Sequence, residues 1–430
     1  MTHFGLLCPA ASGHLNPMTS LGHVLRRRGH RVTLVAIPDG RERALAAGLE
    51  FAAIGAEDYP EGSTAALFAR LGELSGAAAF KATIAHFQRS TTVILRDAPV
   101  RLQQLGVEAL LIDQTSFGGV SIAQALGLPF ISVSGALLLN PDPDVPPVNV
   151  GWRYSPRRWA RLRNRLGNAL LGRISRPITR IVLDYRRQHG LPELSDPADA
   201  WSPLLQICQQ PAAFEYPRRR LPDGLHFTGP LTAPDSRPAV DFPWERLTGQ
   251  PLIYASLGTI QNRRLGLFQT IAAACQDRDA QLVIALGGGC RPEDLPPLPG
   301  VPLVVGNAPQ LQLLERAALT ITHAGLNTLL ESLSQAVPMV AIPIANDQPG
   351  VAARVAWSGS GAVVPVHRLS EPRLSRALDR VLQDDRYRDN ARRLQMAIQQ
   401  AGGVERAADL VEQAIRTGRP VRRDPAAAGV

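Results

Sequence analysis

Short apolar runs alternate with amphipathic stretches in both halves of the chain, and this alternation constrains the fold most strongly. In the first half it predicts a first helix at about residues 18–28 and strands at residues 3–9, 31–37, 109–112 and 129–133. In the second half it predicts helices near residues 267–275 and 328–335, and strands at residues 252–256, 281–285, 303–305, 319–322 and 339–342. Buried strands that alternate with helices are typical of parallel sheets with crossover helices. The sequence therefore predicts an α/β fold of two Rossmann-like domains with parallel sheets, which face each other across an interdomain cleft.

The boundary between the two halves is marked by composition. The segment from Phe227 to Gln250 is rich in proline, glycine and aspartate, which is typical of a linker. A chain of 430 residues also exceeds what one core usually organises. We expect an N-terminal domain, a linker, a C-terminal domain, a last helix that could pack back on the N-terminal domain, and a disordered tail, at residues 1–230, 231–250, 251–400, 401–417 and 418–430.

The composition excludes several classes of protein. With 45% hydrophobic and 19% charged residues, the chain can form compact cores and is not of the disordered class. Its four cysteines are widely spaced, which argues against a structural zinc site and against a disulfide framework. No apolar run approaches the ~18 residues of a membrane span, and no basic leader precedes an apolar run. These features predict a soluble protein of the reducing cytoplasm.

The positive charge is concentrated in one segment. The formal net charge is +9, and residues 151–190 account for all of it, because they hold eleven arginines and one acidic residue. No nucleic-acid-binding motif is present, so we expect no nucleic acid partner. Apolar residues recur in this segment mostly at steps of three and four, at Trp152, Trp159, Leu162, Leu166, Leu170, Ile174, Ile178 and Ile181. The pattern predicts a basic amphipathic helix, which either packs on its own domain or contacts an anionic membrane surface.

A polar cluster follows one of the strands expected in the second half. The strand ends at Thr322, and the chain turns through Gly325 into a helix whose first amides and dipole place roughly half a positive charge at the cleft. His323, Asn327 and Thr328 add donors there, so that a pyrophosphate would fit without a metal ion. Each residue also has a simpler interpretation, since His323, for example, could only cap the helix.

Three further polar residues extend this cluster. Glu331 lies one helical turn beyond Asn327, where it could accept hydrogen bonds from ribose hydroxyls. Asp347 and Gln348 follow the next strand and would suit neighbouring hydroxyls of a hexose. Taken singly, Glu331 could be a solvated helix residue and Asp347-Gln348 an ordinary turn.

The first half offers a candidate general base. His14 follows the first strand in the turn Gly-His-Leu-Asn-Pro, and histidine is the side chain whose pKa is closest to neutral. Asp113 ends another strand and could orient the imidazole, as in other His–Asp pairs. The alternatives are a turn or cap role for His14 and capping of a helix near residues 119–126 by Asp113. Asp142-Pro143-Asp144 has an Asp-x-Asp form, but its proline-rich loop argues against a metal site, and we expect neither a metal nor a cofactor.

The order and spacing of these residues resemble a known family. The eight-residue step from His323 to Glu331 and the sixteen-residue step from Glu331 to Asp347 resemble the nucleotide-sugar signature of family 1 UDP-glycosyltransferases, whose fold is called GT-B. The resemblance implies that His323, Asn327 and Thr328 hold the diphosphate, Glu331 the ribose, and Asp347 and Gln348 the sugar. It also implies a phosphate-side loop at Ser256, Gly258 and Thr259, Ala308 and Gln310 beside the base, and catalysis by His14 with Asp113.

Within that family, the opening residues 1–4, residues 321–328 and the motif at 347–354 resemble those of bacterial carotenoid glucosyltransferases of the zeaxanthin type. This implies metal-independent, inverting transfer of a hexose, expected to be glucose, from a UDP-sugar to a hydroxyl of a lipophilic molecule. Plant members have tryptophan where this chain has Asn307 and Leu326, so dTDP-sugars stay open as donors. Flavonoid-type or macrolide-type soluble acceptors, a nucleotide-sugar epimerase and a non-catalytic nucleotide-sugar-binding protein are the alternatives.

Overall fold

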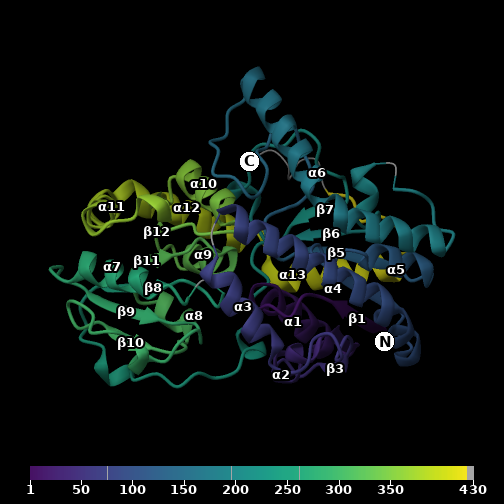
Figure 1. Cartoon of the computed structure of the whole chain (residues 1–430), viewed down its shortest axis with the longest axis horizontal. Helices are drawn as coiled ribbons and strands as arrows, with labels where there is room; N and C mark the ends of the chain where they lie inside the picture. The colour runs from purple at the N-terminus through teal and green to yellow at the C-terminus, as the bar shows by residue number, and fades with distance from the viewer. Residues whose placement is uncertain (75, 195, 261, 424–430) are drawn as a thin grey trace.

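Two parallel sheets organise the chain, as the sequence predicts (Figure 1). The computed structural model describes residues 1–74, 76–194, 196–260 and 262–423. The first sheet has seven strands in the order β3-β2-β1-β4-β5-β6-β7, with bounds β1 His3–Leu7, β2 Arg31–Ala36, β3 Glu50–Ala53, β4 Ala109–Asp113, β5 Phe130–Ser134, β6 Gln206–Cys208 and β7 Leu225–Phe227. The second has six strands in the order β10-β9-β8-β11-β12-β13, with bounds β8 Leu252–Ser256, β9 Gln281–Ala285, β10 Leu303–Val305, β11 Ala317–Thr322, β12 Met339–Ala341 and β13 Gly361–Val363. Four strands, β3, β6, β7 and β13, lie outside the predicted runs, because they are short and contain few of the large aliphatic residues that mark the other strands.

Helices cover both faces of the first sheet, and the central strands β1, β4 and β5 are therefore buried along their whole length. One face packs mainly against α1 and the other against α4, α5 and α6. The helices of this half are α1 Ser12–Arg27, α2 Arg41–Ala46, α3 Ser63–Glu73, α4 Gly76–Leu105, α5 Gly119–Ala125 and α6 Arg158–Gln188. Among the described residues, no helix is both long enough and apolar enough to span a bilayer.

The second sheet is covered in the same way, and part of its core is shared between the domains. Its helices are α7 Leu265–Cys275, α8 Gln310–Leu314, α9 Leu326–Ser334, α10 Gln348–Ser358, α11 Glu371–Gln383 and α12 Asp385–Ala401. Leu137 and Phe214 of the N-terminal half pack in one cluster with the buried faces of α9, α10 and α12. Beside them Arg354 of α10 donates to Glu215 at 2.6 Å, and both side chains are almost fully buried. This side of the cleft is therefore a fixed contact between the domains.

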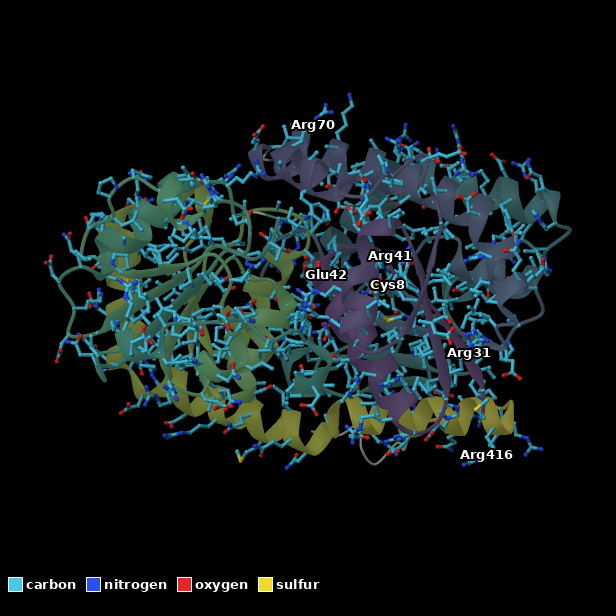
Figure 2. All side chains as sticks on the ribbon, turned by 90° about the horizontal axis from the view of Figure 1, so that it is seen from below. Cys8, Arg31, Arg41, Glu42, Arg70 and Arg416 are labelled. Carbon is cyan, nitrogen blue, oxygen red and sulfur yellow. The ribbon has the colours of Figure 1, made fainter. Side chains whose placement is uncertain are left out.

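The last helix, α13 Gly403–Thr417, returns to the N-terminal domain. It runs beneath α1 along the lower edge of Figure 2, where Arg416 marks its far end. Val404, Ala407, Leu410 and Val411 are buried in the same core as α1 and the first sheet. At the surface, Arg28, the C-cap residue of α1, forms ion pairs of 2.6–2.9 Å with acidic residues of α13, namely Glu405, Asp409 and Glu412.

The chain beyond α13 differs from the disordered tail expected from residue 418. Val421 is buried, and its N–H donates to the carbonyl of Leu204 at 2.9 Å. The N–H of Arg423 donates to the carbonyl of Asp223 at 2.7 Å. These backbone bonds beside β6 and β7 order the chain as far as Arg423, and residues 424–430 lie outside the described residues.

Candidate active site

A cavity of about 2160 Å³ lies between the domains, at the carboxyl ends of both sheets. Such clefts are where doubly wound folds bind ligands. All the residues that the sequence marks as candidates line this cavity: His14, Asp113, Ser256, Gly258, Thr259, Ala308, Gln310, His323, Gly325, Asn327, Thr328, Glu331, Asp347 and Gln348. The structure thus brings both halves of the expected site to one place.

The N-terminal side of the cavity holds a histidine–aspartate pair. Nδ1 of His14 lies 3.0 Å from Oδ2 of Asp113, which is the last residue of β4 and completely buried. The other carboxylate oxygen of Asp113 accepts from the N–H of Thr115 at 2.8 Å and from its hydroxyl at 2.5 Å. Asp113 does not cap α5, because that helix starts after Gly118 with no side-chain cap. The carboxylate is therefore held where it fixes Nδ1–H of the imidazole and leaves Nε2 able to accept a proton.

The charges around His14 favour its protonated form. Burial alone would lower the pKa of His14, but the charge and hydrogen bond of Asp113, with a contribution from Asp347, raise that pKa above the usual value. Asp347 belongs to the C-terminal domain, and burial raises its own pKa. The proposed sugar-binding carboxylate and the proposed base therefore line the same cavity from different domains.

The helix that carries His14 begins earlier than the sequence suggests, because it continues through Pro17. We expected a helix from about Met18, yet α1 begins at Ser12 and contains Pro17. Proline has no N–H to donate to the carbonyl four residues earlier, which here is that of Gly13. Nδ2 of Asn327 donates to this carbonyl at 2.9 Å instead. A side chain of α9 thus replaces the missing bond of α1, one residue before His14.

Asn327 is held on its other side as well. Its Oδ1 accepts from Nε2 of Gln209 at 2.8 Å, and the same nitrogen donates to the carbonyl of Gly135. The side-chain amide that we expected at the diphosphate therefore joins the two domains in this structure. Gln209 is a residue that sequence reasoning missed, since its partners are 74 and 118 residues away and no local pattern marks it.

His323 lies between two glycines on the C-terminal side. A Cβ atom at Gly258 would lie 2.6 Å from Cε1 of His323, and one at Gly325 would lie 2.5 Å from it. Gly258 also has a φ of +73°, which other residues rarely adopt. Burial lowers the pKa of His323 to about 4, so its ring is neutral at physiological pH. His323 does not cap α9, whose N-cap is Gly325, and its Nδ1 is buried without a partner among the described residues.

Glu331 is buried and each of its carboxylate oxygens accepts a hydrogen bond, in contrast to a solvated helix residue. Nη2 of Arg237 donates to its Oε1 at 2.5 Å, and Nε2 of Gln310 donates to its Oε2. The carbonyl oxygen of Gln310 in turn accepts from the hydroxyl of Tyr254 at 3.0 Å. Ribose hydroxyls that bind Glu331 would share its carboxylate oxygens with Arg237 and Gln310. Arg237, in the segment expected as a linker, was also missed, because it is 94 residues from Glu331.

Asp347 and Gln348 mark the start of α10, and they are not merely a turn. Oε1 of Gln348 accepts from the backbone N–H groups of Ile344 and Ala345, both at 2.9 Å. These bonds fix the amide and leave its nitrogen to donate. Asp347 is the N-cap of α10, but its side chain makes no capping hydrogen bond. Both groups line the cavity next to the His14 side.

At the end formed by the helices of the N-terminal domain, the cavity is apolar. It is lined by large side chains of α3, α4, α6 and neighbouring loops, including Phe68, Phe80, Phe87, Phe117, Ile178 and Trp201. The sequence marks none of them as site residues, because large apolar residues look like ordinary core positions.

The two carboxylates of the Asp142-Pro143-Asp144 triplet bind other groups of the protein. Oδ2 of Asp142 accepts from the N–H groups of Arg219 and Arg220 at 3.2 and 3.1 Å. Asp144 pairs with Arg161 at 2.5 Å and with Arg219 at 3.0 Å. Within the described ranges, no three His, Cys, Asp or Glu side chains gather in a way that could hold a metal ion.

Comparisons with known proteins show to which family the chain belongs. The family described as UDP-glucoronosyl and UDP-glucosyl transferase matches residues 185–405. A zeaxanthin glucosyltransferase of Pantoea ananas is 32% identical over 423 residues, covering 98% of each chain. That of Pseudescherichia vulneris is 33% identical over 417 residues, covering 96% of this chain and 98% of the relative.

A solved structure of the glycosyltransferase of kitacinnamycin superposes with a TM-score of 0.75 at 22% identity, covering 96% of this chain and 98% of the other. At that identity the likeness shows the fold alone, and it confirms the GT-B architecture. The family match and the full-length relatives show more: the chain is a UDP-sugar-dependent transferase and belongs to the UDP-glucoronosyl and UDP-glucosyl transferase family.

Proposed function

We propose that this enzyme transfers glucose from UDP-glucose to a hydroxyl group of a lipophilic acceptor of the hydroxycarotenoid type, with inversion at the anomeric carbon. The observation that carries the proposal is the His14–Asp113 pair, which shares one cavity with Asp347, Gln348 and the start of α9. A base on one wall and a site for a nucleotide-sugar on the other are what a direct displacement needs.

In the proposed step, Nε2 of His14 takes the proton of the acceptor hydroxyl as its oxygen bonds to the anomeric carbon. The bond from that carbon to the diphosphate breaks on the opposite face. Asp113 remains ionised and stabilises the imidazolium that forms. The N-terminal amides of α9 and the neutral ring of His323 donate to the departing diphosphate and stabilise its charge. The proposal includes no metal ion and no cofactor.

Two features support a lipophilic acceptor. Aromatic and aliphatic side chains line the N-terminal end of the cavity, and apolar ligands bind in such pockets. The two relatives described above are both named zeaxanthin glucosyltransferases. For the donor, Asn307 leaves the base without an aromatic platform, so a dTDP-sugar is the second candidate.

The test is nucleotide release in the presence of EDTA, with UDP-glucose or dTDP-glucose as donor and with zeaxanthin in detergent or a soluble phenol as acceptor. We expect release with UDP-glucose and zeaxanthin, its loss in His14→Ala, and a β-linked product from the α-linked donor. Release only with the phenol would move the enzyme to soluble acceptors of the flavonoid or macrolide type. Binding of UDP-glucose without any turnover would favour a non-catalytic binding protein, and a new sugar nucleotide without an acceptor would indicate an epimerase.

We also propose that the enzyme works in the cytoplasm in peripheral contact with the membrane. The amphipathic segment 151–190 supports this contact, and its structure allows a more specific proposal.

A further inference from the structure

Helix α6 exposes a row of large apolar side chains. Trp159, Leu162, Leu166, Leu170 and Ile174 are 56%, 59%, 64%, 59% and 39% exposed. Their steps of three and four residues place them on one side of a helix with about 3.6 residues per turn. Single exposed apolar residues are ordinary on protein surfaces, but a contiguous apolar row marks an interaction site. We refer to these five residues as the apolar row.

Unpaired arginines flank the apolar row. Arg158, Arg165, Arg173, Arg176 and Arg180 are exposed, and no carboxylate of the described chain pairs with them. The one acidic residue of α6, Asp184, is paired with Arg187. A symmetric contact between two copies of this chain would bring these arginines face to face, which disfavours a second copy as partner. Apolar side chains beside basic ones instead complement the interface of an anionic lipid bilayer.

The opposite side of the same helix lines the catalytic cavity. Asn168, Leu171, Ser175, Ile178 and Val182 belong to the cavity wall, and they lie roughly half a turn away from the apolar row. In Figure 1 the amino-terminal part of α6 extends at the top beyond the two sheets. One helix, about 10 Å across, therefore separates a surface suited to lipid from the cavity that would receive a lipophilic acceptor.

We propose that the apolar row of α6 docks the enzyme on the anionic face of a lipid bilayer and that the acceptor passes from the bilayer into the cavity alongside this helix. The proposal rests on the proposed function only for the nature of the acceptor. The docking surface itself rests on exposure and charge.

The test is co-sedimentation of the full-length enzyme with vesicles of phosphatidylcholine, alone or mixed with phosphatidylglycerol. We expect binding to the anionic vesicles and its loss in the triple variant Leu162→Glu, Leu166→Glu, Leu170→Glu. A matched control is Val100→Glu, Leu382→Glu, Met396→Glu, which changes three exposed apolar residues of other helices and should bind like the wild type. Replacing the five flanking arginines with glutamine should weaken anionic binding by roughly fivefold for each arginine that contacts the surface.

Activity measurements with two acceptors distinguish a defect in membrane docking from a defect in catalysis. With a soluble phenol, the apolar-row variant should release nucleotide as fast as the wild type, whereas with zeaxanthin in anionic vesicles it should be several times slower. Equal vesicle binding by wild type and apolar-row variant would overturn the docking proposal. So would a wild-type dimer that this variant converts to a monomer, since the row would then be a self-association surface. Vesicle binding that depends on the apolar row, in an enzyme without turnover on any acceptor, would refute the proposed function and leave the docking surface standing.

Discussion

The two walls of the cleft are built in different ways. The donor wall comes mainly from residues 307–348, with the loop after β8 at Gly258 added to it, and its polar side chains are fixed by neighbours, as Glu331 is by Arg237 and Gln310. The acceptor wall is assembled from α3, α4, α6 and loops far apart in the sequence, and is mostly apolar. The difference teaches that recognition of the nucleotide needs fixed polar geometry, whereas a lipophilic acceptor needs space and apolar surface. Substitutions on either wall should therefore have separable effects.

The largest effect is expected at the proposed base on the acceptor wall. Replacing His14 with alanine removes the proposed base and should lower kcat by roughly 10²- to 10⁴-fold. UDP binding, measured by titration calorimetry, should stay unchanged, because the histidine belongs to the acceptor wall. Loss of UDP affinity equal to the loss of rate would contradict this separation.

Asp113→Asn should test the role of His14 as the base through the pH dependence of kcat/KM. The carboxylate raises the pKa of His14, so its neutralisation should lower that pKa. Since the proposed base acts in its neutral form, the acid limb of the kcat/KM profile should move to lower pH, while the maximal rate falls by roughly 10²-fold or more. Thr115→Val, which removes one donor to the same carboxylate, should produce a smaller fall. An unmoved acid limb would show that another group titrates.

A substitution on the donor wall should instead lower the affinity for UDP. An alanine at Gly258 would place Cβ 2.6 Å from the His323 ring and strain a positive φ. We expect UDP affinity to fall roughly tenfold, comparable to one lost hydrogen bond to a charged group. Gly266→Ala is the control, because a Cβ there meets nothing within 4 Å. Unchanged UDP affinity in Gly258→Ala would mean that the position of His323 does not matter for the diphosphate.

The smallest expected effect is a gain in nucleoside affinity instead of a loss. Arg237 donates to an oxygen of Glu331 for which ribose would compete, so Arg237→Gln should tighten the binding of uridine by a few fold. The control is Arg246→Gln, an exposed arginine of the same segment for which no ion pair occurs among the described residues. Weaker uridine binding in Arg237→Gln would show that the arginine orients Glu331 instead of competing for it.

The difference between the walls also explains what the sequence could predict. His14 and Asp113 are recognisable because parallel strands bring their carboxyl ends to one edge, and the donor residues because they share one segment. Arg237 and Gln209 act through contacts between segments far apart in the sequence, so no local spacing marks them. The start of α1 was misplaced because Pro17 suggests a helix boundary, while the bond that it forfeits is supplied by Asn327 of the other domain.

The return of α13 to the N-terminal domain has a consequence for biosynthesis. Val404, Leu410 and Val411 fill the same core as Phe4, Leu6 and Leu21, so the first domain to leave the ribosome requires the last helix to be made. Until then the part of this core that α13 covers stays exposed, although domains usually fold in the order in which they are synthesised. A chain that stops before Gly403 would therefore lose the solubility of its first domain, and its second domain would be the more independent part.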